Sequence, residues 1–263
     1  MCIMSAAARE SWLRKAATRI EVSQTKLFAR VVAGVQYLVY EMAIDTSSDV
    51  AMILPLPVAQ VADDAIEFLD FSRAQGLFRE LANLFPSHDL FELGIPRGAP
   101  IPQGRPLVVH SVGSFEASYV PTLADMDRLD PRFRIADTIW KALPQYTNAG
   151  FAVFKLKPGK QTIHPMAMKF ATAEPSSIFF PTVHVHDGKL HDTARFDHAL
   201  YFQTSTTPVA HAPDRSTTID RSTQPPPPSP TIANAHGAVS VLDPVYRVEL
   251  RGTMSNADTR IAI

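Results

Sequence analysis

Apolar residues recur along this chain in short runs, and few of the runs have helical spacing. Runs rich in Val, Tyr and Phe occupy 26–44, 50–58 and 107–120, and such runs dominate from residue 150 onward. β-Branched and aromatic side chains fit a pleated, half-buried surface, so these runs predict strands. Gly34 divides the first run, and we expect a turn there between two strands.

Helical spacing is confined to a few segments. Residues 6–17 are rich in Ala, Leu, Arg and Lys without Gly or Pro, which predicts a short helix. Apolar positions within 64–85 follow an amphipathic helical pattern that Pro86 closes. Residues 122–143 are mostly polar and partly helical in pattern. Together with the strands, this predicts an α+β, mostly β fold of two packed antiparallel sheets with a few helices.

The composition changes after residue 203. Residues 204–237 are dominated by Ser, Thr and Pro, with four consecutive prolines at Pro225–Pro228, which is typical of a disordered or polyproline-type linker. Order resumes in 238–263 with a strand able to return to the main sheet. The expected organisation is a main globular domain over 1–203, a linker over 204–237 and a C-terminal strand segment. The Pro-rich linker also offers a site for a protein partner.

Composition and charge exclude several classes of protein. Hydrophobic residues make up 46% of the chain and its formal net charge is −1, so nothing draws it toward nucleic acid or a membrane surface. No apolar run approaches the roughly 20 residues of a membrane span. The single cysteine, Cys2, fits a reducing compartment. We therefore expect a soluble cytoplasmic protein that binds neither nucleic acid nor membrane.

The most distinctive chemistry lies in Pro181–His191, with the sequence PTVHVHDGKLH. If Asp187 and Gly188 form a two-residue turn, His184 lies opposite His191. Strand side chains alternate between faces, so His186 shares their face. Three imidazoles on one face suit zinc or another divalent transition metal, which would acidify a bound water for hydrolysis. The pattern predicts a metal site at these three histidines.

The same residues also fit an ordinary exposed hairpin, whose solvent face is polar. Lys189 falls on the face of the three histidines, and its positive charge opposes a metal cation. His164 and His198 are further candidate ligands, although strict alternation places His198 on the other face from His191. The metal site and the plain surface hairpin both remain open.

A second candidate is Cys2. If Met1 is removed, the new α-amino group titrates near about 8 and is able to activate the thiol. The start Met-Cys-Ile and the later Leu27–Arg30 resemble the N-terminal-nucleophile hydrolases of the choloylglycine hydrolase type. That resemblance implies an amidohydrolase with Cys2 as nucleophile and Arg30 as its partner. The family has an aspartate shortly after the arginine, whereas Val-Val-Ala-Gly follows here.

Most of the chain also resembles an uncharacterised bacterial protein family. The phrases that carry the likeness are VGSFEASYVPTLADMDRLD, GFAVFKL, HPMAMKF, FFPTVHVHDG and FDHALYFQ. The resemblance implies a genuine folded domain but attaches no activity to it.

Three functions therefore remain open from the sequence. The first is metal binding, with or without hydrolysis, and the second is a thiol amidohydrolase. The third is a non-catalytic binding or scaffold domain that engages a partner. A Gly-x-Ser-x-Gly nucleophile elbow, a Gly-x-Gly-x-x-Gly fingerprint and a phosphate loop are all missing from the sequence, so serine hydrolases and nucleotide binding have no support.

Overall fold

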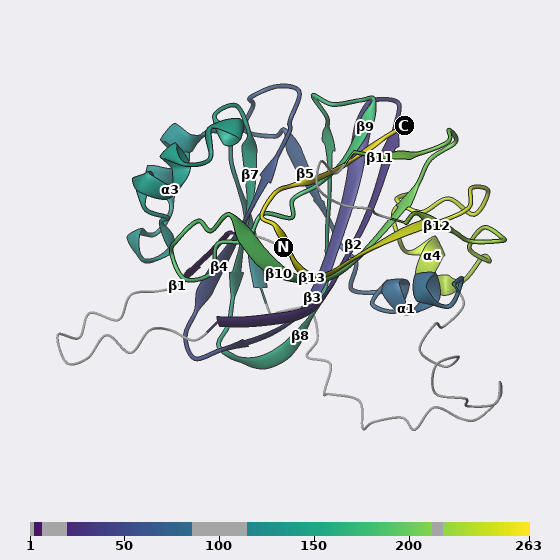
Figure 1. The fold of residues 1–263 in the computed structure, drawn as a ribbon, viewed down its shortest axis with the longest axis horizontal. Coiled ribbons are helices and arrows are strands. Elements are labelled where there is room, and N and C mark those ends of the chain that lie inside the picture. The colour runs from purple at the N-terminus through teal and green to yellow at the C-terminus, as the bar shows by residue number, and fades with distance from the viewer. Residues whose placement is uncertain (1–2, 7–19, 86–114, 212–217) are drawn as a thin grey trace.

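The computed structural model describes residues 3–6, 20–85, 115–211 and 218–263 (Figure 1). Strands dominate this part of the chain and form a four-stranded, a seven-stranded and a three-stranded sheet. The helices between them are short. The predicted mostly β, α+β architecture with packed antiparallel sheets is confirmed, and a small third sheet is added to it.

The four-stranded sheet explains the long apolar run at 50–58. Its antiparallel strands lie in the order β1 (Ile3–Ala6), β4 (Val50–Leu56), β7 (Gly150–Leu156) and β6 (Phe115–Val120). Every residue of β4 is buried, because alternate side chains enter two different hydrophobic clusters. A strand buried on both faces needs apolar residues at every position, so no polar alternation is seen in it.

The seven-stranded sheet contains a tight hairpin among its central strands. Its order is β12 (Asp220–Arg221), β13 (Tyr246–Ser255), β10 (Thr193–Gln203), β2 (Ile20–Val32), β3 (Val35–Thr46), β8 (Gly159–Ala171) and β5 (Ile66–Leu69). The pairing of β10 with β2 is parallel, and the other pairings are antiparallel. Ala33 and Gly34 have φ of 49° and 76°, as a two-residue primed turn requires. The predicted turn at Gly34 is therefore confirmed.

The C-terminal residues lie within the sheets. β13 pairs with β10, and β14 (Thr259–Ala262) lies between β11 (Val209–His211) and β9 (Ser177–Phe180) in the three-stranded sheet. The described part of the Pro-rich segment contributes β11, β12 and helix α4 (Pro230–Ala233). Ser229 caps α4 by accepting from the Ile232 N–H, and its hydroxyl donates to Glu80 at 2.6 Å.

Tertiary pairing shortens the helix expected over 64–85. Residues 66–69 pair with β8 as strand β5, and helix α1 covers only Leu77–Ala82. The prediction of one helix is wrong because strand pairing outweighs local helical preference here. The partly helical 122–143 segment consists of short pieces: η1 (Leu123–Arg128), η2 (Pro131–Phe133), α3 (Asp137–Lys141) and η3 (Pro144–Tyr146). The predicted helix over 6–17 lies outside the described residues, apart from Ala6 at the end of β1.

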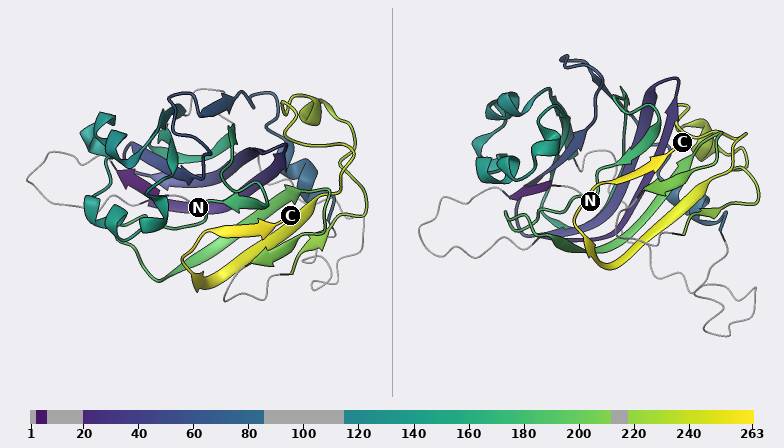
Figure 2. Two further views of the ribbon diagram at one scale, coloured as in Figure 1. Left: turned by 90° about the horizontal axis from the view of Figure 1, so that it is seen from above. Right: turned by 45° about the horizontal axis from the view of Figure 1, so that its top comes forward.

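The two larger sheets pack face to face. One buried cluster joins Met52 and Phe154 of the four-stranded sheet to Leu38 and Leu200 of the seven-stranded sheet. The helical segment 123–146 covers the outer face of the four-stranded sheet, and α1 and α4 cover the outer face of the other. The helices consequently lie at opposite ends of the molecule, with the sheets between them (Figures 1 and 2).

Helices of membrane-spanning length and hydrophobicity do not occur among the residues that the structure describes.

Candidate functional site

The segment 181–192 is irregular and does not form the expected hairpin. Val185 makes an isolated parallel bridge with Ile3 of β1. The Nδ2 group of Asn256 donates to the carbonyl oxygens of both His184 and His191, each at 2.9 Å. The side-chain amide thus links the two backbones that were expected to pair directly. The prediction that His184 and His191 face each other across a hairpin is wrong.

His184 and His186 nevertheless lie together, and the other histidine ring beside His184 is that of His198 of β10. The His184 ring stacks on His186 with centroids 5.5 Å apart and on His198 with centroids 5.2 Å apart. The His191 side chain is 58% exposed, and its Nε2 lies 2.9 Å from Oδ2 of Asp187. The structure therefore joins two predicted histidines to His198 and leaves His191 at the surface.

Burial keeps two of these rings neutral. Desolvation lowers the pKa of His186 to about 4 and the pKa of His198 to about 3. The backbone N–H of Asp197 donates to Nδ1 of His198 at 3.2 Å, and Oδ1 of Asp197 lies 3.5 Å from the same nitrogen. In the described structure, Nε2 of His186 and Nε2 of His198 are buried without a hydrogen-bond partner. The rings pack through their faces and edges instead.

The metal hypothesis still has to be tested by experiment. Within the described residues, no group of three or more His, Cys, Asp or Glu side chains is placed to hold a metal ion. Zinc or another divalent metal at His184, His186 and His191 stays a prediction that metal analysis of the purified protein must decide.

Of the two residues in the Cys2 hypothesis, the structure describes Arg30 but not Cys2, which lies outside the described residues. Arg30 is near the end of β2, and its Nη2 lies 3.2 Å from Oδ2 of Asp243. This pair joins β2 to the turn before β13. A role for Cys2 as nucleophile with Arg30 as its partner stays a prediction.

A cleft of about 430 Å³ opens where the ends of the three sheets meet. One wall is formed by residues from 55–61, at and beyond the end of β4, and another by residues from 145–149, which precede β7. Ala173 and Glu174 of the β8–β9 turn close a third side, and β9 and β14 contribute Phe179 and Arg260. A volume of this size is within the range of about 300–1,000 Å³ that is usual for ligand sites.

The cleft has an apolar wall and a polar wall. Pro57 and Val58 supply apolar surface, and Val61 is 59% exposed beside them. Gln145 and Asn148, on the segment that precedes β7, are exposed and carry side-chain amides. The arrangement suits an occupant that has both an apolar group and hydrogen-bonding groups.

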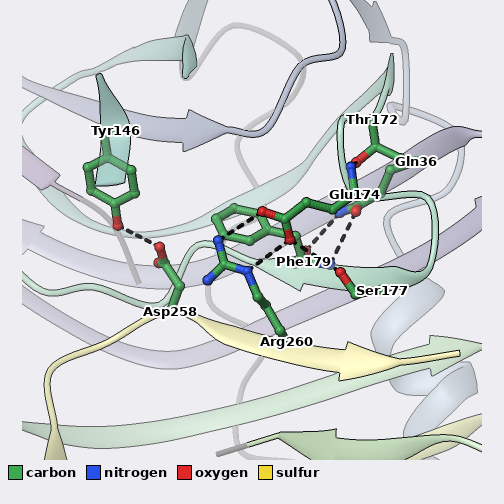
Figure 3. A network of polar contacts seen from close by, with 8 residues as sticks. All are labelled: Gln36, Tyr146, Thr172, Glu174, Ser177, Phe179, Asp258 and Arg260. Carbon is green, nitrogen blue, oxygen red and sulfur yellow. Dashed lines mark hydrogen bonds and ion pairs between the residues drawn. The ribbon is translucent and has the colours of Figure 1, made fainter. Parts of the chain in front are cut away.

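Glu174 and Arg260 form a bidentate ion pair at this cleft (Figure 3). Nε of Arg260 donates to Oε2 of Glu174 at 2.8 Å, and Nη2 donates to Oε1 at 3.0 Å. The guanidinium carbon lies 4.8 Å from the centre of the Phe179 ring. Ser177 Oγ also donates to Glu174 at 3.2 Å, and the Glu174 backbone N–H donates to Thr172 Oγ1 at 3.0 Å. These contacts fix the orientation of the guanidinium.

The pair leaves donors of Arg260 unused by Glu174. A guanidinium carries five N–H groups, and Glu174 takes one from Nε and one from Nη2. Both N–H groups of Nη1 and the second one of Nη2 are not part of this pair. The side chain is 42% exposed, so an anion that enters the cleft is able to reach these donors.

The wall at 145–149 is held by a buried bond beside the cleft. Tyr146 donates its hydroxyl proton to Oδ2 of Asp258 at 2.7 Å (Figure 3). Oδ1 of Asp258 accepts from the backbone N–H groups of Thr182 and Val183 at 3.0 and 3.3 Å. Burial raises the pKa of the Asp258 carboxyl and also the pKa of the Tyr146 hydroxyl. The cleft is therefore built on a rigid frame.

Sequence reasoning missed both ion-pair residues of the cleft. Glu174 and Arg260 are 86 positions apart, and no local pattern connects them. The prolines at the end of the apolar run were a usable signal, because Pro57 follows the last residue of β4 and a proline cannot donate to a further strand pairing. His198 was named only as a possible extra ligand, on the wrong face for His191.

Comparisons with known proteins give one kind of match. No protein-family model matches the chain, and no curated protein sequence matches it. In solved structures, a chain of the caspase-8/P35 complex is 11% identical, with a TM-score of 0.44, over 91% of this chain and 96% of that chain. Two structures of a mutated baculovirus P35 after caspase cleavage have TM-scores of 0.47 and 0.41. They are 11% and 12% identical, over 91% and 93% of this chain and 99% and 98% of theirs. Likeness at these values carries no argument about function.

Proposed function

We propose that this chain is a non-catalytic binding domain that takes an extended segment of a protein partner in the cleft between the sheets. The observation that carries the proposal is the cleft itself, with its apolar wall, its polar wall and the fixed guanidinium of Arg260.

A second cavity favours a long occupant over a compact one. This cavity of about 380 Å³ lies beside β5 and the end of β8, and it shares Ala59 with the cleft. The two hollows therefore adjoin along the segment 59–65. An extended peptide is able to follow both, with side chains entering each hollow in turn.

The charged groups around the cleft support binding more than catalysis. Glu174 is engaged with Arg260, and Asp258 is engaged with Tyr146. A general base must reach a proton of the substrate directly or through one water. Carboxylates already committed to neighbouring side chains are better suited to hold the walls in place.

The partner site expected from the sequence was the Pro-rich segment. In its described part, Ile232 is buried in the cluster beneath α1 and α4, and Ser229 bonds to Glu80. These residues are committed to the fold. The cleft is accordingly the better candidate surface for a partner.

Selection from a displayed peptide library tests the proposal. Ala173→Trp fills the cleft, because Ala173 is exposed and lines it. Ala117→Trp is the matched control, since Ala117 is exposed on β6 and outside the cleft. We expect selected peptides to bind the Ala173→Trp variant at least about tenfold more weakly and the control as well as the unmodified protein. Equal binding to all three proteins, or a selection that yields no binder, would contradict the proposal.

A further inference from the structure

Resting on the proposed peptide-binding function, we further propose that the cleft takes the carboxyl terminus of its partner. In this arrangement the terminal carboxylate accepts from the unused N–H groups of Arg260, and the last side chain lies on the apolar wall at Pro57 and Val58. The occupant is a protein tail that ends in an apolar residue.

The fixed orientation of Arg260 is the first step toward this assignment. Glu174 accepts two hydrogen bonds, of 2.8 and 3.0 Å, from one edge of the guanidinium. The Phe179 ring lies against the face of the guanidinium, with its centre 4.8 Å from the guanidinium carbon. A side chain held from two sides loses little conformational freedom when it binds a ligand. Its free edge presents parallel N–H groups, which match the two oxygens of a carboxylate.

The assignment also depends on apolar residues that line the same cleft as the guanidinium. Pro57, Val58 and Ala149 line the same hollow of about 430 Å³ as Arg260. An occupant that presents both an anion and an apolar group is able to use both parts of this hollow. A peptide carboxyl terminus presents both on a single Cα atom. The backbone of an internal peptide segment offers only neutral carbonyls to the guanidinium and makes weaker hydrogen bonds with it.

Glu174 provides a second test, in which a substitution should strengthen binding instead of weakening it. Its carboxylate orients Arg260, and it also repels a second carboxylate in the same cleft. Glu174→Gln keeps one side-chain oxygen as an acceptor for Arg260 and removes the negative charge. If Arg260 binds a terminal carboxylate, this substitution tightens binding. If the ion pair only holds the turn in place, the substitution has no such effect.

The experiment uses acetylated tetrapeptides that end in Val, Leu, Ile or Phe, each as a free acid and as an amide. Binding to the full chain is measured by isothermal titration calorimetry. We expect the free acids to bind about tenfold or more tightly than the amides. Loss of a charge-assisted hydrogen bond in Arg260→Gln should weaken the acids by about 10- to 100-fold. Arg260→Lys keeps the positive charge but cannot donate two parallel hydrogen bonds. Its affinity for the acids should lie between those of the unmodified protein and of Arg260→Gln.

Glu174→Gln should tighten the acids by about two- to five-fold, the size expected for one partly exposed charge. The amides should be insensitive to it. Circular dichroism of each variant confirms the fold before binding is measured. Equal affinity of acids and amides, or weaker binding of the acids to Glu174→Gln, would overturn the assignment of Arg260.

The failure of this inference can be told from the failure of the proposed function. If library-selected peptides lose binding with Ala173→Trp but ignore Arg260→Gln, the cleft binds peptides and the carboxyl-terminal assignment is wrong. If neither the tetrapeptides nor any selected peptide depends on Ala173, both proposals fall.

Discussion

The side chain of Gln36 pairs with the backbone of Phe179 as a neighbouring strand would. Nε2 of Gln36 donates to the Phe179 carbonyl at 2.7 Å, and the Phe179 N–H donates to Oε1 of Gln36 at 3.2 Å. Gln36 is fully buried on β3. Phe179 lines the cleft and supports Arg260. One amide group therefore links the seven-stranded sheet to the cleft.

Two other side-chain amides act in the same way. Gln203 accepts from the Ser240 N–H at 2.7 Å and donates to the Ser240 carbonyl at 2.8 Å. Asn256 accepts from the His184 N–H at 2.7 Å and donates to its carbonyl at 2.9 Å. Because an amide carries a donor and an acceptor together, it satisfies a backbone edge that is not paired with a strand.

We expect Gln36→Met to lower the free energy of unfolding by about 2–4 kcal/mol. Methionine is close to glutamine in shape, so packing is largely kept. It removes both hydrogen bonds and leaves two buried backbone groups of Phe179 without their side-chain partner, each at a cost of about 1–3 kcal/mol. Urea denaturation measures the change.

Gln60→Met is the matched control, because Gln60 is exposed. An exposed substitution of this kind should stay within about 0.5 kcal/mol of the unmodified protein. An effect of Gln36→Met no larger than that of the control would show that the paired amide adds nothing to stability.

The strands were the most predictable part of this fold. The Val- and Tyr-rich residues on either side of Gly34 predicted two strands and a turn, and β2 and β3 lie there. Hydrophobic pattern works for such a hairpin because its contacts are local in sequence. β5 was missed because Ile66–Leu69 becomes a strand only by pairing with β8, about a hundred residues away.

The candidate site was less predictable for the same reason. Residues 181–191 have hairpin chemistry, yet Asn256 binds the backbone of both His184 and His191. Nothing near Asn256 in the sequence marks it for that position. Likewise, the cleft depends on Glu174 meeting Arg260, and that contact follows from the order of strands in space.

The buried histidines predict a loss of stability in acid. Desolvation lowers the pKa of His186 to about 4 and of His198 to about 3, from the ordinary value of about 6.5. Below pH 6.5 these histidines bind protons in the unfolded chain but remain neutral in the folded chain. The free energy of unfolding should therefore fall as the pH decreases from about 6.5 toward 4. The ideal limit is about 1.4 kcal/mol per pH unit for each histidine.

Urea denaturation at pH 7.5, 6.0 and 5.0 measures this dependence. His198→Leu removes one of these groups and should make the dependence shallower. His191→Leu, at an exposed histidine, should leave it steep. The account would be refuted by a pH dependence that His198→Leu does not change.

The metal hypothesis predicts near-stoichiometric zinc, or another transition metal, in protein purified without a histidine tag or chelator. Metal binding requires neutral imidazole, and His186 is neutral near pH 7. The variant that combines His184→Ala with His186→Ala should lose the metal, and His191→Ala tests the third predicted ligand. Elemental analysis of the three proteins gives the answer. Metal-free protein in every case would eliminate the hypothesis.

Gly150, which follows the cleft wall at the start of β7, has no room for a larger residue. A Cβ atom there would lie 2.7 Å from the Tyr119 hydroxyl oxygen, 2.9 Å from Tyr119 Cε2 and 3.1 Å from Val58 Cγ2. These distances are shorter than ordinary contacts, and two of the atoms belong to a ring that is packed in place. Overpacking of this kind costs about 1–3 kcal/mol.

We therefore expect Gly150→Ala to lower the free energy of unfolding by about 1–3 kcal/mol. Tyr119→Phe alone should be close to neutral, because the hydroxyl is buried without a hydrogen-bond partner in the described structure. In the double variant the closest atom is gone, so the loss should be smaller than the sum of the single losses, which marks a direct contact. A double-mutant cycle by urea denaturation measures the coupling. Strictly additive losses would mean that the hydroxyl does not limit the space at Gly150.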